Sequence, residues 1–130
     1  MTAESIKKTI LLLEDEIIQQ KMMSFILSND YSLNIVSNGI EALNWLTKNS
    51  LPDLIIMDWV MPQMDGKTFL YNFKTKKEFS QIPVIVLSSY QYVHQEISEI
   101  PYTPKERLIK PVEPQKLKTS IQEVFISRNS

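Results

Sequence analysis

A chain of 130 residues with 43% apolar and 22% charged side chains has the size and composition of one globular domain. Its net charge of −1 argues against a nucleic-acid-binding domain, which usually carries a basic excess. The absence of cysteine excludes disulfides and thiolate metal sites, and no apolar run approaches the ~18 residues of a membrane span. We therefore expect a single domain, 1–130 with a core of about 8–127, that works in the cytoplasm without nucleic acid or membrane as partners.

The first half of the chain predicts two strand–helix pairs. Residues 9–13 form an apolar run that ends in acids, which is typical of a buried strand. An amphipathic helix follows, and we expect its apolar stripe to face the core: Ile18, Met22, Phe25 and Ile26. Residues 33–36 predict a second short strand, and Asn38-Gly39 precedes a helix stripe of Ile40, Leu43 and Leu46.

The stretch from Leu54 to Gly66 carries the strongest local signal. Four apolar residues run straight into Asp58, and the run is bounded by Pro52 before it and by Pro62 after it. Such a run predicts a strand buried on both faces, with Asp58 at its carboxyl end. Ligands bind at that edge of open α/β sheets, but an aspartate there can equally be a turn residue that ends the strand. The stretch alone does not decide between the two interpretations.

The second half of the chain continues the alternation. First comes a helix whose apolar stripe is Phe69, Leu70 and Phe73. The charged residues after this stripe are expected on a solvated face: Lys74, Lys76, Lys77 and Glu78. Residues 83–87 predict a strand that stops at Ser88, followed by a helix lined by Tyr92, Val93, Ile97 and Ile100. Residues 107–109 predict a last short strand that runs into Lys110. Pro114 suits the first turn of a final helix with the stripe Leu117, Ile121, Val124 and Phe125.

Short buried strands that alternate with helices predict a parallel sheet covered by helices on both faces. Right-handed crossovers place the carboxyl end of every strand at the same edge. Polar side chains that follow four of the strands should therefore meet there: Glu14, Asp15, Asp58, Ser88 and Lys110. Carboxylates that crowd together repel one another, so a cation should lie among them.

The residue types at this edge favour magnesium and phosphoryl transfer. Oxygen ligands without histidine or cysteine nearby favour Mg²⁺, which takes one or two carboxylates, keeps several waters and often binds a phosphate oxygen. Lys110 adds a fixed positive charge, and Ser88 adds a hydroxyl. In phosphoryl transfer, positioning and charge neutralisation supply most of the catalysis. Asp58 is then the natural nucleophile.

Four ordered motifs resemble one known family. They are Glu14-Asp15 after an apolar strand, the block Met57-Asp58-x-x-Met61-Pro62-x-Met64-Asp65-Gly66, the strand Ile82–Ser88, and Lys110-Pro111. Together they resemble the response-regulator receiver domain of two-component signalling, the CheY-like family, from about Ile10 to Ile126. The resemblance implies an α/β fold with a doubly wound, five-stranded parallel sheet of flavodoxin-like topology and strand order 2-1-3-4-5.

The resemblance also implies a role for each residue at the edge. Asp58 would accept a phosphoryl group from a phosphohistidine on a histidine kinase or phosphotransfer protein. Mg²⁺ would bind to Glu14, Asp15, Asp58 and the backbone carbonyl of Val60. Lys110 would pair with the phosphoryl oxygens, and the Lys110-Pro111 peptide is expected to be cis.

Ser88 would close on the phosphoryl group and thereby switch a surface that a downstream protein reads. The chain would then be a signalling module and not an enzyme, apart from autophosphorylation and autodephosphorylation at Asp58. Pairing of two copies into a homodimer stays open, as does the identity of the kinase.

The chain departs from the family's pattern at the switch. Arg107 stands where the family usually has an aromatic residue, and a guanidinium cannot bury as such a ring does. Residues 101–104 replace a common Gly-Ala pair, so we hypothesise that Tyr102 or Tyr90 takes over part of the coupling. Val60 and Tyr90 stand at positions that modulate dephosphorylation in the family, and their bulk predicts that water is screened and the signal is prolonged.

Other interpretations remain open. The chain can be the receiver of a larger or multi-component regulator. A small phosphatase with an aspartate nucleophile is disfavoured, because Val60 leaves no general acid two residues after Asp58. A nucleotide-binding flavodoxin-like protein is disfavoured, because the chain has two glycines and no phosphate-binding loop. His94, the one histidine, is interpreted as a plain surface residue.

Overall fold

The computed structural model describes residues 7–89 and 104–128. In this part of the chain, five parallel strands form one sheet in the order β2-β1-β3-β4-β5, which confirms the expected fold class. The strands are β1 (Thr9–Leu13), β2 (Ser32–Val36), β3 (Leu54–Asp58), β4 (Val84–Ser88) and β5 (Glu106–Ile109). The helices are α1 (Ile17–Leu27), α2 (Gly39–Lys48), α3 (Gly66–Lys74), the 3-10 helix η2 (Lys77–Phe79) and α5 (Pro114–Arg128). The helix expected over residues 92–100 lies outside the described residues.

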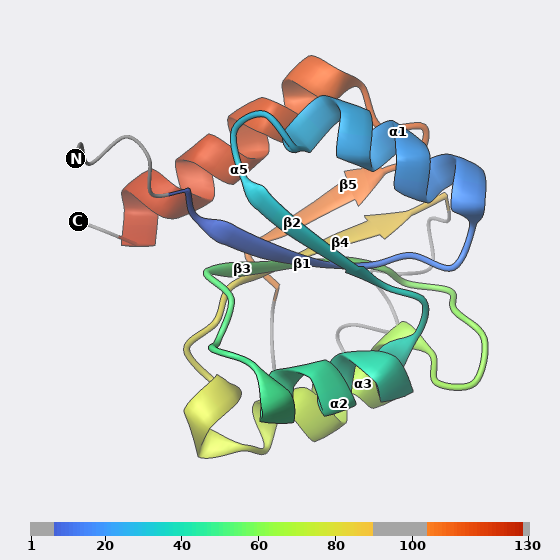
Figure 1. The fold of residues 1–130 in the computed structure, drawn as a ribbon, viewed down its shortest axis with the longest axis vertical. Helices are drawn as coiled ribbons and strands as arrows, with labels where there is room; N and C mark the ends of the chain where they lie inside the picture. Colours follow the sequence, from blue (N-terminus) through green and yellow to red (C-terminus); the bar gives the residue numbers. More distant parts are fainter. Residues whose placement is uncertain (1–6, 90–103, 129–130) are drawn as a thin grey trace.

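Helices cover both faces of the sheet (Figure 1). α1 and α5 lie on one face, and α2 and α3 lie on the other. Side chains alternate along a strand, so Leu11 and Leu13 of β1 join the core under α2 and α3, whereas Ile10 and Leu12 join the core under α1 and α5. All residues of β3 and β4 are buried, which explains why these strands appear in the sequence as continuous apolar runs.

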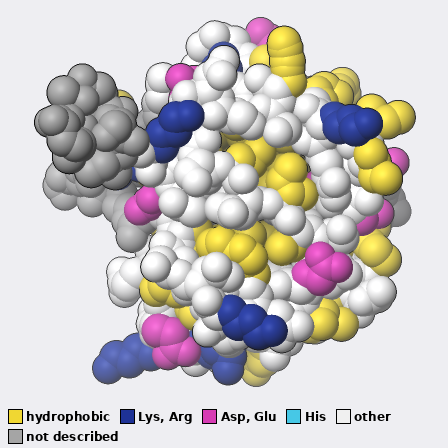
Figure 2. Space-filling view, viewed as in Figure 1, with side chains coloured by type: hydrophobic (Ala, Val, Ile, Leu, Met, Phe, Trp, Pro, Cys, Tyr) yellow, Lys and Arg dark blue, Asp and Glu magenta, His cyan; other side chains and the backbone are white. Residues whose placement is uncertain are grey.

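The sequence correctly predicts helix α1, but the apolar stripe that was expected to be buried is largely exposed. Met23 and Leu27 are buried in the core, whereas Ile18 is 76% exposed and Phe25 is 77% exposed. Met22 is also exposed, and Ile26 is the one member of the predicted stripe that packs against the core. Apolar residues occur on both sides of this helix, so their periodicity fits two stripes, and only packing onto the sheet, in the core that α1 shares with α5, selects one. Figure 2 shows the hydrophobic side chains that remain exposed over α1, at the upper right of the view.

The stripe expected for α2 is partly wrong as well. Leu46 is buried and Leu43 packs against the core, but Ile40 is 43% exposed. Ala42 is fully buried in its place. The helix begins where the Asn38 side chain accepts a hydrogen bond from the backbone N–H of Glu41, at 2.9 Å, and this cap sets the rotation of the first turn.

Lys74 lies at the end of α3 and is half-buried, so the prediction of a solvated face is wrong for this residue. Its ammonium donates hydrogen bonds to the backbone carbonyls of Ser80 and Ile82, both at 2.9 Å. Burial, together with the nearby charge of Lys105, lowers the pKa of Lys74 to about 8. These hydrogen bonds connect the end of α3 to the segment that precedes β4. The spacing of apolar residues along the helix does not predict such a contact.

The stripe predicted for α5 is confirmed, because Leu117, Ile121, Val124 and Phe125 are all buried. Pro104, before β5, and Leu108, within β5, are buried as well, whereas the other residues of β5 are exposed or half-exposed. α5 has 15 residues, and none of the helices in the described part of the chain is long and apolar enough to cross a membrane.

Candidate functional site

The register of the sheet brings the ends of four strands level with one another. Leu13 of β1 lies opposite Met57 of β3, so the next residues along the two strands, Glu14 and Asp58, are neighbours at the carboxyl edge. Asp58 in turn lies opposite Leu87 of β4, and Ser88 lies opposite Ile109 of β5. The sequence-predicted residues therefore gather at one edge, where Asp58 and Ser88 end the buried strands β3 and β4, Glu14 follows β1, and Lys110 follows the largely unburied β5.

Three carboxylates converge at this edge. Glu14, Asp15 and Asp58 each offer an oxygen that lies within 4.8 Å of the others. Glu14 is 2% exposed and Asp58 is 8% exposed, whereas the Asp15 side chain is open to solvent. Two nearly buried carboxylates beside a third repel one another, and a positive charge between them lowers that cost.

Lys110 supplies one such charge. Its Nζ lies 2.8 Å from Oδ2 of Asp58 and 3.7 Å from Oε1 of Glu14. Burial by itself would lower the pKa of Lys110, but the hydrogen bond to Asp58 and the negative charges of Asp58 and Glu14 raise it above its usual value. The ammonium is therefore charged at neutral pH and donates to Asp58. The Lys110-Pro111 peptide is cis, as expected.

Glu14 is held by groups that sequence reasoning missed. The backbone N–H of Glu16 donates to Oε2 of Glu14 at 3.1 Å, and the side-chain amide of Gln20 donates to the backbone carbonyl of Glu14 at 2.7 Å. Burial raises the pKa of the Glu14 carboxyl, and this effect exceeds the lowering by the Glu16 N–H and Lys110. A glutamine one helical turn into α1 was the available signal for the second contact.

Ser88 and Val60 flank Asp58 on neighbouring segments. Ser88 ends β4 and is 3% exposed, and its backbone carbonyl accepts a hydrogen bond from the N–H of Lys110 at 2.9 Å. Val60 follows β3 and its side chain is 70% exposed. The structure thus places Ser88 on the strand between those that lead to Asp58 and Lys110, and it leaves the Val60 side chain exposed two residues after Asp58.

The loop after Asp58 is set by close contacts between Trp59 and Gly66. The N–H of Trp59 donates to the carbonyl of Leu87 at 2.9 Å, and its own carbonyl accepts from the N–H of Gly66 at 2.8 Å. The Trp59 ring is 4% exposed and lies against Gly66, where an added Cβ would come within 2.6 Å of ring atom Cε3. Gln63, between them, has a positive φ of 69°. The loop therefore folds back on the residue next to Asp58.

We predict that Gly66→Ala destabilises the protein by about 1–3 kcal/mol, because the new methyl group overlaps a buried ring and a backbone oxygen that cannot both move. Gly39→Ala is the matched control. There the new Cβ meets only the side chain of Met64, which is half-buried and can rotate. Urea unfolding of both variants measures the difference, and equal midpoints for Gly66→Ala and wild type would show that the loop is not held by this contact.

Of the residues that depart from the family's pattern, Arg107 and Val60 lie in the described part of the chain. Arg107 on β5 has an exposed side chain, as expected for a guanidinium at this position. Tyr90, His94 and Tyr102, including the proposed coupling through the two tyrosines, lie outside the described residues.

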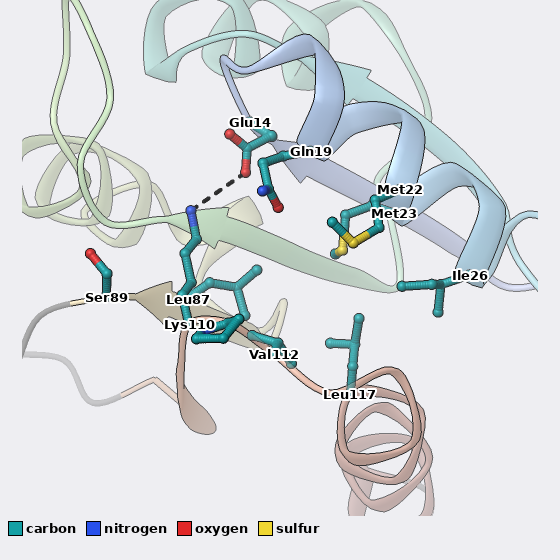
Figure 3. A pocket seen from close by; sticks show the side chains of 11 residues that line it. Glu14, Gln19, Met22, Met23, Ile26, Leu87, Ser89, Lys110, Val112 and Leu117 are labelled. Atoms are coloured by element: carbon teal, nitrogen blue, oxygen red, sulfur yellow. Dashed lines mark ion pairs between the residues drawn. The ribbon is translucent and has the colours of Figure 1, made fainter.

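A cavity of about 240 Å³ adjoins the site between α1 and the start of α5 (Figure 3). Apolar side chains form most of its wall, among them Met22, Ile26 and Leu117. Glu14 and Lys110 lie at its polar end, joined by their ion pair. The exposed face of α1 therefore leads directly to the carboxylate cluster.

A five-stranded parallel sheet with an aspartate, two further acids and a lysine at its carboxyl edge defines the receiver class of signalling domain. The family model described as "Response regulator receiver domain" matches residues 10–122. The chain belongs to the response-regulator receiver family.

Relatives of this chain include both kinases and free-standing regulators. It is 28% identical over 122 residues to the sensor histidine kinase TmoS of Ectopseudomonas mendocina, a match that covers 94% of this chain and 12% of the kinase. It is 29% identical over 88 residues to a chemotaxis protein CheY homolog of Campylobacter jejuni, which covers 68% of each protein. The chain thus spans about an eighth of the kinase.

Solved structures agree with this family. The signal receiver domain of a signal transduction histidine kinase from Syntrophus aciditrophicus has a TM-score of 0.82 and 28% identity, covering 92% of this chain and 91% of that one. The chemotaxis response regulator CheY4 of Vibrio cholerae has a TM-score of 0.81 and 26% identity, covering 92% and 99%. A receiver domain of a Pseudomonas aeruginosa sensor histidine kinase, 23% identical with a TM-score of 0.81 and coverage of 91% and 97%, has a magnesium ion coordinated in its active site cleft.

Proposed function

We propose that Asp58 is a phosphoacceptor that takes a phosphoryl group from a phosphohistidine on a partner histidine kinase or phosphotransfer protein. The observation that carries this proposal is the pairing of one Asp58 oxygen with the Lys110 ammonium at 2.8 Å, beside two more carboxylates. Asp58 is thereby a nucleophile at the end of a rigid strand, next to a fixed positive charge. Such preorganised charge is what phosphoryl transfer requires.

The transfer exchanges one bond for another. An Asp58 carboxylate oxygen forms a bond to phosphorus while the bond from phosphorus to the donor histidine nitrogen breaks. The electron pair of the broken bond stays on that nitrogen and the other ring nitrogen carries a proton, so the products are an acyl phosphate and a neutral histidine. Lys110 can then shift from the carboxylate to the phosphoryl oxygens, because both lie within reach of its flexible side chain. Ser88, on the strand between them, can donate its hydroxyl to the same oxygens.

Magnesium fits the acids at this edge. Glu14, Asp15 and Asp58 offer oxygen ligands only, close enough together to share one ion, and two of these carboxylates are nearly buried. We assign Mg²⁺ to these three side chains and to the backbone carbonyl of Val60. When bound, Mg²⁺ would neutralise the carboxylates and the incoming phosphoryl group.

The exposed face of α1 is the surface we assign to the phosphohistidine donor. Ile17 is 66% exposed and Phe25 is 77% exposed, and large apolar residues in such numbers on one short helix are typical of an interaction surface. The cavity beside Met22 continues this surface to Lys110 and Glu14 (Figure 3). A donor that covers α1 would therefore hold its histidine next to Asp58.

A second setting is favoured by the lengths of the relatives. The chain spans 12% of the sensor kinase TmoS and 36% of a probable transcriptional regulator of Cyanidium caldarium that is 33% identical to it. The domain can therefore receive its phosphoryl group within a multi-domain regulator as well as beside one. In either setting its own chemistry is limited to formation and loss of the acyl phosphate at Asp58, and its product is an altered surface for a downstream protein.

Acetyl phosphate and MgCl₂ test the proposal without a known kinase. The intact mass should rise by one phosphoryl group, and the added mass should be lost in hydroxylamine, which cleaves acyl phosphates. Chelation of the metal should prevent the reaction. Failure to gain mass with acetyl phosphate, and with a panel of phosphorylated kinases, would overturn the proposal.

We predict that Glu14→Gln stabilises the metal-free protein at neutral pH by about 1 kcal/mol, because it removes one of the crowded, buried negative charges. The pKa of Glu14 is raised in the folded state, so between pH 4.5 and that raised pKa the folded protein binds more protons than the unfolded chain. Wild-type stability should therefore fall as pH rises through the raised pKa, whereas the variant should lack this loss. Thermal unfolding at several pH values measures both effects.

Magnesium supplies the matched measurement. MgCl₂ should raise the melting temperature of wild type more than that of Glu14→Gln, because a ligand that binds the folded state stabilises it. Glu78→Gln, an exposed change outside the site, should respond to MgCl₂ as wild type does. An equal response of all three proteins would remove Glu14 from the proposed ligand set.

A further inference from the structure

One peptide group joins Glu14 and Asp15, two of the acids assigned to the metal. It lies just past the end of β1, because the last registered pair between β1 and β2 is Leu13 with Val36. The N–H of Glu14 still donates to the carbonyl of Val36 at 2.9 Å, and the carbonyl of Glu14 comes after this last bond to β2. The orientation of the peptide group sets the directions in which both acid side chains leave the backbone.

Gln20 of α1 holds the Glu14 carbonyl. Its side-chain amide donates to the carbonyl oxygen of Glu14 at 2.7 Å. The backbone N–H of Gln20 also donates to the carbonyl of Glu16 at 2.9 Å, so the side chain projects from a helical turn whose own backbone is fixed. Gln20 is half-buried, and water therefore competes less for its hydrogen bond to Glu14.

The start of α1 differs from the starts of α2 and α3. The side chain of Asn38 caps α2 and that of Asp65 caps α3, each by accepting a hydrogen bond from a backbone N–H of the first turn. In the described part of the chain, the side chain of Glu16, at the corresponding position of α1, makes no such bond. The contact from Gln20 to Glu14 therefore links this helix to the loop before it where a side-chain cap is missing.

The acids of this loop need such a link because they repel one another. Glu14, Asp15 and Asp58 each offer an oxygen within 4.8 Å of the others, and the Lys110 ammonium offsets only part of this charge. Without a metal ion, the repulsion favours movement of the loop away from Asp58. A loop that leaves the binding arrangement part of the time binds a metal more weakly, in proportion to the fraction that stays competent.

We propose that Gln20 is a positioning residue for the metal site, whose hydrogen bond to the Glu14 carbonyl keeps the Glu14 and Asp15 carboxylates directed at one shared ion. This role rests on the proposed function, which assigns Mg²⁺ to these acids. Gln20 acts through the peptide group between two of the ligands, without contact to the metal itself. A side chain of similar length that lacks a donor should therefore weaken metal binding and leave the fold intact.

The test compares the binding of Mn²⁺ to Gln20→Met and to wild type, followed by electron paramagnetic resonance of the free ion. Mn²⁺ prefers the same oxygen ligands as Mg²⁺, and its binding needs no phosphoryl donor. Methionine keeps the length of glutamine but cannot donate to the Glu14 carbonyl. The dissociation constant should rise about fivefold, the equivalent of one lost hydrogen bond. Gln122→Met, an exposed change on α5, should bind Mn²⁺ as wild type does.

Hydrogen exchange in the metal-free protein gives a second readout. The amide of Glu16, which donates to Oε2 of Glu14 at 3.1 Å, should exchange faster in Gln20→Met, because the loop opens more often. A lower melting temperature with an unchanged dissociation constant for Mn²⁺ would make Gln20 a stabilising contact only and overturn the proposal. If wild type binds no Mn²⁺, the metal assignment and this role both fail. Binding of Mn²⁺ that weakens in Gln20→Met, without phosphorylation of wild type by acetyl phosphate, would support this role and overturn the phosphoacceptor alone.

Discussion

Replacing Asp58 with asparagine is expected to abolish phosphorylation by acetyl phosphate. The amide is neutral and its oxygen is a poor nucleophile, and no other carboxylate in the cluster lies at hydrogen-bond distance from the Lys110 ammonium. Intact mass spectrometry with MgCl₂ and acetyl phosphate measures the effect directly. Wild type should gain one phosphoryl group, and Asp58→Asn should gain none.

A control variant and a second measurement accompany this experiment. Asp30→Asn changes an exposed aspartate outside the site and should be phosphorylated as wild type is. Trp59 directly follows Asp58 and is 4% exposed, so its fluorescence should change when beryllofluoride and Mg²⁺ bind. The second tryptophan, Trp45, is replaced by phenylalanine in this measurement so that the signal has one source. A phosphoryl gain in Asp58→Asn would identify a different acceptor and contradict the proposed function.

Replacing Lys110 with methionine is expected to slow phosphorylation by roughly a hundredfold, the effect of removing one preorganised donor from developing phosphoryl charge. Methionine keeps much of the length and apolar stem of lysine but removes the ammonium that lies 2.8 Å from Asp58. The initial rate of mass gain with acetyl phosphate measures the loss. Because Lys110 also offsets the repulsion among the acids, the metal-free variant should be less stable than wild type.

Lys48→Met is the matched control, since Lys48 is an exposed lysine at the end of α2. It should react at the wild-type rate. If Lys110→Met also reacts at that rate, the ammonium has no role in transfer, and its contact with Asp58 serves stability alone. If Lys110→Met is phosphorylated slowly but keeps the wild-type melting temperature, the ammonium acts in phosphoryl transfer and not in stability.

The acids and Ser88 at the carboxyl edge were predictable because they end or follow buried strands, whereas Lys110 follows β5, in which only Leu108 is buried. A strand buried on both faces leaves an unbroken apolar run, and the polar residue that ends it is visible in the sequence, as for Asp58 after Met57 and Glu14 after Leu13. A parallel topology then requires these ends to meet. The distances between them, including the 2.8 Å contact of Lys110, came only from the packed sheet.

Helix faces were less predictable, because periodicity identifies a helix without always selecting the side that is buried. In α1 both sides are apolar, and only its packing onto the sheet, in the core shared with α5, shows that Leu27 is buried and Phe25 is exposed. The exposed side is the surface we assign to the donor.

By itself, the sequence determined the order of strands and helices, the acids and lysine at one edge, and the resemblance to receivers, since these depend on local burial and residue type. The tertiary structure alone decided which face of α1 is exposed and which carbonyls Lys74 meets. These features depend on contacts between segments distant in the chain. A pattern read along one segment carries no information about what packs against it.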